Sequence, residues 1–139
     1  MEKIKITNLI KIPTEGGDIF QCLKNSEKSY CGFGEAYFSN INFRKIKAWK
    51  RHLKMTCNII VPRGKVKFVF YDEDCDTKSA IEIGEDNYCR ITVLPKIWFG
   101  FEGLHHPSSL ILNISDIPHS PNEIERKKID AINFDWKTL

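Results

Sequence analysis

A group of ionisable side chains surrounds one tryptophan in the stretch IKAWKRHLKMT, residues 46–56. It contains three lysines, one arginine and His52, and after Cys57 it is followed by the mainly apolar run NIIV. Histidine is largely neutral near pH 7 and can take or give a proton, while lysine can hold an anion. Cations beside an apolar strand form either a solvated face or the wall of a pocket for an anionic ligand.

The period of two in a β-strand predicts which of these side chains lie together. In residues 47–54, one face carries Ala48, Lys50, His52 and Lys54, and the opposite face carries Lys47, Trp49, Arg51 and Leu53. In residues 34–40, Glu35, Tyr37 and Ser39 share a face. Each segment thus presents a polar, titratable face, which in a small barrel points either to water or into the lumen.

Short runs that alternate between polar and apolar residues make up most of the chain. They predict strands over residues 3–12, 34–42, 66–72, 89–95 and 109–115, separated by turn signals such as VPRGK around Gly64. Residues 66–72 have the pattern of an ordinary half-buried strand, with Val66, Phe68 and Phe70 on the apolar face and lysines on the other.

Only residues 120–130, SPNEIERKKID, have a helical pattern. Ser120 is the expected N-cap, Pro121 occupies the first helical position, and Glu123 completes a capping box. Ile124 and Ile129 would then face the body of the protein. Many short strands followed by one late helix predict an all-β fold, a jelly-roll barrel with one short C-terminal helix.

Composition narrows the class of protein. A chain of 139 residues with 42% hydrophobic and 28% charged residues predicts one globular domain, residues 1–139. A net charge of +3 is compatible with an anionic ligand but too small for a nucleic-acid partner. No apolar run approaches the ~18 residues of a membrane span, and the N-terminus lacks a signal-peptide pattern. Five cysteines without a CxxC spacing predict reduced thiols and a cytoplasmic location.

The order GEAYFS, IKAWKRH, VPRGKVKFVFYD, NYCRITVLPKIWFGFEGL and SLILNISDIPHSPNEIERK resembles the cupin-fold sugar-nucleotide enzymes. These are the dTDP-4-dehydrorhamnose 3,5-epimerases and the dTDP-4-keto-6-deoxyhexose 3,4-ketoisomerases, and the similarity covers roughly residues 30 to 136. The resemblance implies a cupin-like jelly roll, a homodimer, and metal-free, cofactor-free chemistry on a nucleotide-linked 4-keto-6-deoxy sugar for surface glycans. Such an epimerisation or ketoisomerisation starts by removing a proton alpha to the ketone.

The resemblance also implies roles for three candidate catalytic residues. His52 takes the place of the second histidine of a His-x-His pair and is the candidate base. Lys50 takes the place of the first histidine and would stabilise the enolate or serve as the base itself. Tyr37 matches an active-site tyrosine of the ketoisomerases and is the candidate proton donor.

Substrate binding is expected to involve Glu35, Lys47, Arg51 and Trp98. Lys47 takes the place of a phosphate-binding arginine, although its strand parity is opposite to that of His52. Trp98 would line the sugar site, and Glu35 would bind a sugar hydroxyl or orient Lys50.

Several family positions differ in this chain, which leaves two alternatives open. Phe99 stands where a histidine is usual, and no tyrosine occurs near Leu110–Asn113, where the epimerases carry their acid. The fold could therefore serve as a non-catalytic sugar- or nucleotide-binding module. A metal-dependent cupin would need at least three inward ligands, for which the sequence offers His52 and Glu35.

Overall fold

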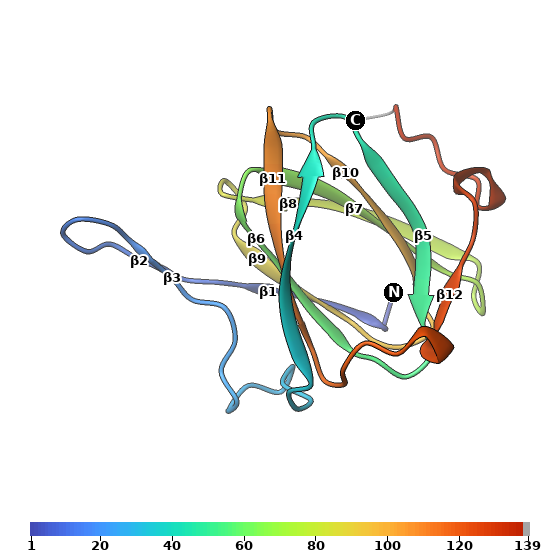
Figure 1. Ribbon diagram of the computed structural model, residues 1–139, viewed down its shortest axis with the longest axis horizontal. Coiled ribbons are helices and arrows are strands. Elements are labelled where there is room, and N and C mark those ends of the chain that lie inside the picture. Colours follow the sequence, from blue (N-terminus) through green and yellow to red (C-terminus); the bar gives the residue numbers. More distant parts are fainter. Residues whose placement is uncertain (138–139) are drawn as a thin grey trace.

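Two five-stranded antiparallel sheets face each other in this computed structural model, which describes residues 1–137 (Figure 1). The first sheet has the order β1 (Ile4–Asn8), β9 (Cys89–Val93), β6 (Cys57–Arg63), β11 (Ser108–Ser115) and β4 (Glu35–Asn42). The second has the order β12 (Ile124–Arg126), β5 (Ile46–His52), β10 (Trp98–Gly103), β7 (Lys65–Asp72) and β8 (Thr77–Gly84). The prediction of an all-β jelly roll is confirmed.

The predicted turn at Gly64 carries the chain from one sheet to the other, because β6 ends just before it and β7 begins just after it. Gly64 has a φ of 92°, and a Cβ atom there would lie 2.3 Å from the Ser109 Oγ. Glycine is required at such a position for both reasons. Strands β6 and β7, on either side of this turn, therefore belong to opposite sheets around the core.

The main core lies between the sheets. Val66, Phe68 and Phe70 point into it as predicted, together with Cys57 and Phe99 of the neighbouring strands. Apolar faces that alternate with polar ones are what two packed sheets bury between them.

The other face of β7 is also buried, so the prediction of a half-buried strand is wrong for that face. Lys67 is only 3% exposed, and its Nζ donates to the Trp136 carbonyl at 3.1 Å and lies 3.4 Å from Glu102. A second apolar cluster, which includes Trp49, Trp98 and Trp136, covers this outer face. The C-terminal segment supplies that cover, which the strand pattern alone does not reveal.

The helix predicted over residues 120–130 does not form. The segment contains a 3₁₀ turn (Pro121–Glu123), strand β12, and a second 3₁₀ turn (Ile129–Ala131). Ser120 makes no side-chain cap, and β12 pairs with β5 along its outer edge (Figure 1). Pairing with a free strand edge satisfies the backbone along this short segment, where a brief isolated helix would be marginal.

A bulge in β5 determines which of its side chains face the lumen. Phe99 of β10 pairs with Lys50, whereas Phe101 pairs with Lys47, so three steps along β5 oppose two steps along β10. The extra residue reverses the alternation, and Lys47 therefore lies on the same face as Lys50. Gly100 makes room for the bulge, since a Cβ atom there would lie 2.6 Å from the Ala48 Cβ.

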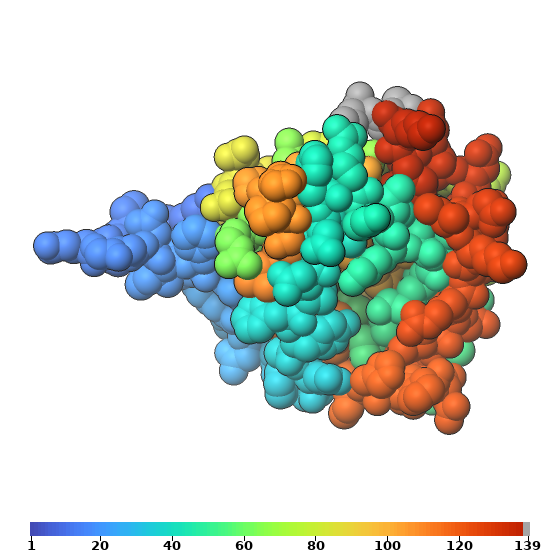
Figure 2. Space-filling view, turned by 45° about the horizontal axis from the view of Figure 1, so that its top comes forward, coloured from blue at the N-terminus to red at the C-terminus, as the bar shows by residue number. Residues whose placement is uncertain are grey.

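A short hairpin of β2 (Lys11–Ile12) and β3 (Ile19–Phe20) projects from the two sheets as an arm (Figures 1 and 2). The strand expected over residues 3–12 is thus divided between β1 and this arm. Among residues 1–137, no helix is long and apolar enough to cross a membrane.

Candidate active site

His52 and Glu123 form a buried pair at the end of β5. The His52 Nδ1 lies 2.5 Å from the Glu123 Oε1, and both residues are 5% exposed. Burial lowers the pKa of His52, and the hydrogen bond to Glu123 opposes that effect only in part. The imidazole is therefore neutral near pH 7, with Nδ1–H donated to the carboxylate and Nε2 left as a base.

Glu123 is a site residue that sequence reasoning assigned to a helix cap. Its second carboxylate oxygen accepts hydrogen bonds from the backbone N–H groups of Lys54 and Met55, each at 3.3 Å. Burial opposes its ionisation, but these bonds and the bond from His52 outweigh burial and hold the Glu123 pKa below its usual value. Glu123 is thus an ionised group that fixes the tautomer and orientation of His52.

Lys50 lies on the lumen face of β5 next to His52, as predicted. Its Nζ is 5.8 Å from the centre of the Phe99 ring, and the His52 ring is stacked on the same phenyl ring with centroids 6.3 Å apart. Burial lowers the pKa of Lys50. Phe99 thus lies against both a lysine whose pKa is lowered and a neutral imidazole.

Tyr37 faces Lys50 from the opposite sheet. Its hydroxyl accepts a hydrogen bond of 3.0 Å from the Asn113 Nδ2, and burial raises its pKa although this bond opposes the rise. The Asn113 Nδ2 is also 3.7 Å from the Cys57 Sγ, whose pKa burial raises to about 11. Cys57 is therefore a neutral thiol at pH 7 and belongs to the main core.

A cavity of about 170 Å³ separates these groups. It lies in the hollow that opens between β4 and β5 in Figure 2. Its lining combines apolar core side chains with polar ones and comprises Tyr37, Ser39, Lys47, Lys50, Ile59, Phe68, Phe99, Phe101, Ile111 and Asn113. His52 is not in this lining but lies behind Phe99.

A second hollow of about 340 Å³ adjoins the first. The two share Lys47, Lys50, Phe99 and Phe101, and the second adds Arg126 of β12. Within residues 1–137, no carboxylate lies at ion-pair distance from Lys47, Lys50 or Arg126. Uncompensated cations around a hollow suit an anionic ligand.

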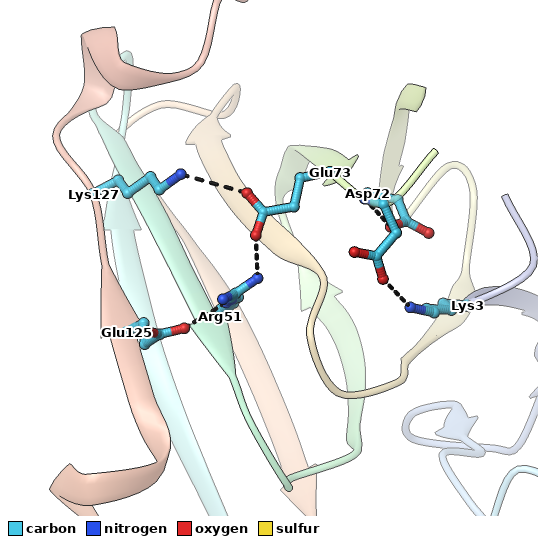
Figure 3. A network of polar contacts seen from close by, with 7 residues as sticks. Lys3, Arg51, Asp72, Glu73, Glu125 and Lys127 are labelled. Atoms are coloured by element: carbon cyan, nitrogen blue, oxygen red, sulfur yellow. Dashed lines mark hydrogen bonds and ion pairs between the residues drawn. The ribbon is translucent and has the colours of Figure 1, made fainter. Parts of the chain in front are cut away.

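Arg51 lies on the opposite face of β5 from Lys50 and is not brought to the cavity. Its guanidinium donates to Glu125 and to Glu73, each at 2.6 Å, and Lys127 lies 3.6 Å from Glu73 (Figure 3). Trp98 lies on the same outer face, with the Arg51 guanidinium 4.8 Å from its ring. Neither side chain is placed to contact a ligand in the lumen.

Glu35 lies at the end of β4, where its carboxylate accepts a hydrogen bond of 2.8 Å from the backbone N–H of His119. It therefore holds the segment before Glu123 and is not in the cavity lining. Lys47 does line the cavity, because the bulge reverses its parity, and its Nζ donates to the Asn40 carbonyl at 3.2 Å. Residues 1–137 contain no group of three or more His, Cys, Asp or Glu side chains placed to hold a metal ion.

Sequence reasoning missed Glu123, Asn113 and Arg126. Asn113 had a signal, since it lies within Leu110–Asn113, the stretch where the family resemblance places an acid tyrosine. Glu123 lies in the segment SPNEIERK, which is part of the family resemblance, but the pattern there predicts a helix cap. Arg126 had no signal, because it reaches the second hollow only through the pairing of β12 with β5.

Comparisons with known proteins agree with this architecture. No family model matches the sequence. The chain is 25% identical over 147 residues to the spore coat polysaccharide biosynthesis protein SpsL of Bacillus subtilis, covering 99% of this chain and 97% of that protein. A variant of the 3,4-ketoisomerase QdtA from Thermoanaerobacterium thermosaccharolyticum, in complex with TDP-4-keto-6-deoxyglucose, shares the fold with a TM-score of 0.78. It has 12% identity, with 91% of this chain and 89% of that one covered.

A dTDP sugar isomerase from Desulfovibrio desulfuricans G20 is more similar. Its crystal structure superposes with a TM-score of 0.92 and 36% sequence identity, over 97% of this chain and 91% of that chain. Likeness in sequence and in fold extends over nearly the full length of both chains. This protein therefore belongs to the family of cupin-fold dTDP-sugar isomerases.

Proposed function

We propose that this protein is an epimerase or 3,4-ketoisomerase of a nucleotide-linked 4-keto-6-deoxy sugar, and that it supplies a sugar for a surface polysaccharide. The observation that carries the proposal is the His52–Glu123 pair beside Lys50, with Tyr37 on the facing sheet. Enolisation next to a ketone requires a base and a group that stabilises the enolate oxygen, and a phenol can then return a proton to carbon.

In this proposal His52 removes the proton alpha to the ketone. Its Nε2 is buried without a hydrogen-bond partner among residues 1–137. Because His52 is stacked on Phe99 and, of the two, only Phe99 lines the cavity, the Phe99 ring must turn aside in this proposal when the sugar binds. Glu123 stabilises the imidazolium that forms. Lys50 stabilises the negative charge on the enolate oxygen, and Tyr37 delivers a proton to the new position.

The phosphates belong in the second hollow. Lys47 and Arg126 line it without a carboxylate partner in the described part of the chain, and two cations suit a diphosphate. The sugar then reaches into the first cavity, which shares Lys47 and Lys50 with this hollow. Arg51 and Trp98 have no part in this arrangement.

A homodimer in the cytoplasm also belongs to the proposal. Exposed apolar side chains support a dimer. Ile19 on the arm is 53% exposed, and Ile10 just before the arm is 61% exposed. Phe38 on the edge strand β4 is 65% exposed. Light scattering of the purified protein tests it by the mass of the particle in solution.

Proton exchange tests the activity. The protein is incubated in deuterated water with a dTDP- or GDP-linked 4-keto-6-deoxy sugar, and the ring protons are followed by NMR. We expect deuterium to enter at C3 or C5, and the incorporation to be lost in His52→Ala or Lys50→Ala. A folded protein that binds nucleotide sugars without exchanging any proton would instead be a binding module. Exchange that disappears after metal chelation would identify a metal-dependent enzyme.

A further inference from the structure

Asn113 and Tyr37 stand directly opposite each other on the neighbouring strands β11 and β4. The Asn113 side chain is buried at 6% exposure, whereas Tyr37 is 37% exposed toward the cavity that both line. The Asn113 Nδ2 donates to the Tyr37 Oη at 3.0 Å. A buried amide thus holds the hydroxyl of a ring that is partly exposed.

This contact determines the direction of the Tyr37 proton. The phenolic oxygen accepts from Asn113, so its own O–H is available to donate elsewhere. Among residues 1–137 this O–H donates no hydrogen bond, and the ring borders the cavity. The proton is therefore directed to where the proposed function places the sugar.

The amide also acts after the proton has left. A phenolate is stabilised by a hydrogen bond to its oxygen, and the buried Nδ2 supplies one without rearrangement. The orientation of the amide is defined by the two contacts of Nδ2, to the Tyr37 Oη and to the Cys57 Sγ.

We infer that Asn113 is a positioning residue that makes Tyr37 the proton donor of this enzyme, a role that rests on the proposed function. His52 takes the C–H proton and leaves an enolate. The Tyr37 O–H bond then breaks as a new C–H bond forms at the opposite face or the neighbouring carbon. The phenolate and the imidazolium that remain recover their starting states by exchange with water.

The test is the ratio of solvent exchange to conversion, measured on one sample by NMR in deuterated water. When donation by Tyr37 slows, the enolate returns through His52 and picks up deuterium without becoming product. We expect Asn113→Leu, which removes the amide at similar volume, to raise this ratio about five- to tenfold. Tyr37→Phe should raise it further. The ratio does not depend on how much of the sample is folded.

Two further variants make the test specific. Asn113→Asp keeps the shape but replaces the donor by an acceptor, so it should raise the ratio as the leucine variant does. Asn58→Leu is the matched control, because Asn58 is a buried amide of the same sheet that donates to the Ser29 carbonyl, away from the cavity. It should lower thermal stability and leave the ratio unchanged.

A wild-type ratio in Asn113→Asp, or in a folded Asn113→Leu protein, overturns the inference. An equal rise in Asn58→Leu overturns it as well, because the effect would then be general to buried amides. Failure of the proposed function has a different signature, since the wild-type protein would show no exchange at all.

Discussion

The two faces of β5 carry similar residues and use them in opposite ways. On the outer face, Arg51 is paired with Glu73 and Glu125 and packs on Trp98. On the lumen face, Lys50 packs on Phe99 without a carboxylate at ion-pair distance among residues 1–137. Compensated charges hold the strand and its neighbours together, whereas uncompensated charges beside a cavity are left for a ligand.

The burial of the two faces supports the same distinction. The outer aromatic cluster is closed by the C-terminal segment, and its buried lysine, Lys67, contacts Glu102. The lumen instead retains a cavity with Lys47 and Lys50 in its wall. A buried cation is tolerated on the outer face because it is paired, and on the lumen face because the cavity is open to an anion.

The largest expected effect is at His52. Replacing it by alanine should lower kcat about 10²- to 10⁴-fold, because the neutral base beside Lys50 is lost. Single-turnover conversion of the nucleotide sugar measures this. If the variant keeps wild-type turnover and Lys50→Met abolishes it, Lys50 is the base.

Lys50→Met should lower kcat about 10²- to 10³-fold, because an enolate that loses its cation forms less readily. The methionine keeps most of the aliphatic stem, so thermal melting should change little. If this variant lost stability and kept its turnover, the lumen face would serve stability, as the outer face does, and the distinction between the two faces would be wrong.

Substitutions on the two faces should separate binding from stability. Arg126→Ala is expected to weaken binding of dTDP about tenfold, measured by calorimetry, with an unchanged melting temperature. Arg51→Ala should leave binding unchanged and lower the free energy of unfolding by about 1 kcal/mol, measured with urea. The reverse result would place the anion site on the outer face.

The smallest effect is a shift in pH dependence. Because burial lowers the pKa of His52, the acid limb of kcat/KM should lie below the ordinary histidine value of ~6.5. Glu123 raises that pKa, so Glu123→Gln should move the limb to still lower pH and also lower the rate. Glu125→Gln, a change on the same segment that affects only Arg51, should leave the limb in place. An upward shift in Glu123→Gln contradicts the assignment.

Local pattern predicted much of this molecule. Alternation in residues 34–42 and 46–52 placed Tyr37, Lys50 and His52 on the faces that the structure shows, because the period of a strand depends only on its own backbone. The jelly roll followed from many such strands with turns between them. Gly64 was identified as a turn residue for the same local reason.

Local pattern failed where a distant segment decides the outcome. Ser120, Pro121 and Glu123 have the spacing of a helix start, yet β12 pairs with the edge of β5 and Glu123 turns to His52. Strand parity placed Lys47 on the face opposite His52, but the structure has Lys47 on the lumen face. The difference comes from the bulge in β5, which depends on the pairing with β10 and is permitted by Gly100. Lys67 was predicted to be exposed, but the C-terminal segment covers it.

The sequence by itself therefore determined the fold class and the positions, on single strands, of the residues proposed to carry acid–base chemistry. Tertiary structure alone decided which partners those residues have. Glu123, Asn113 and Arg126 come from segments that are remote in the chain from His52, Tyr37 and Lys47. The physical reason is that side-chain parity is a property of one strand, whereas hydrogen bonds, ion pairs and cavities require the register between strands, which is established only when the sheets assemble.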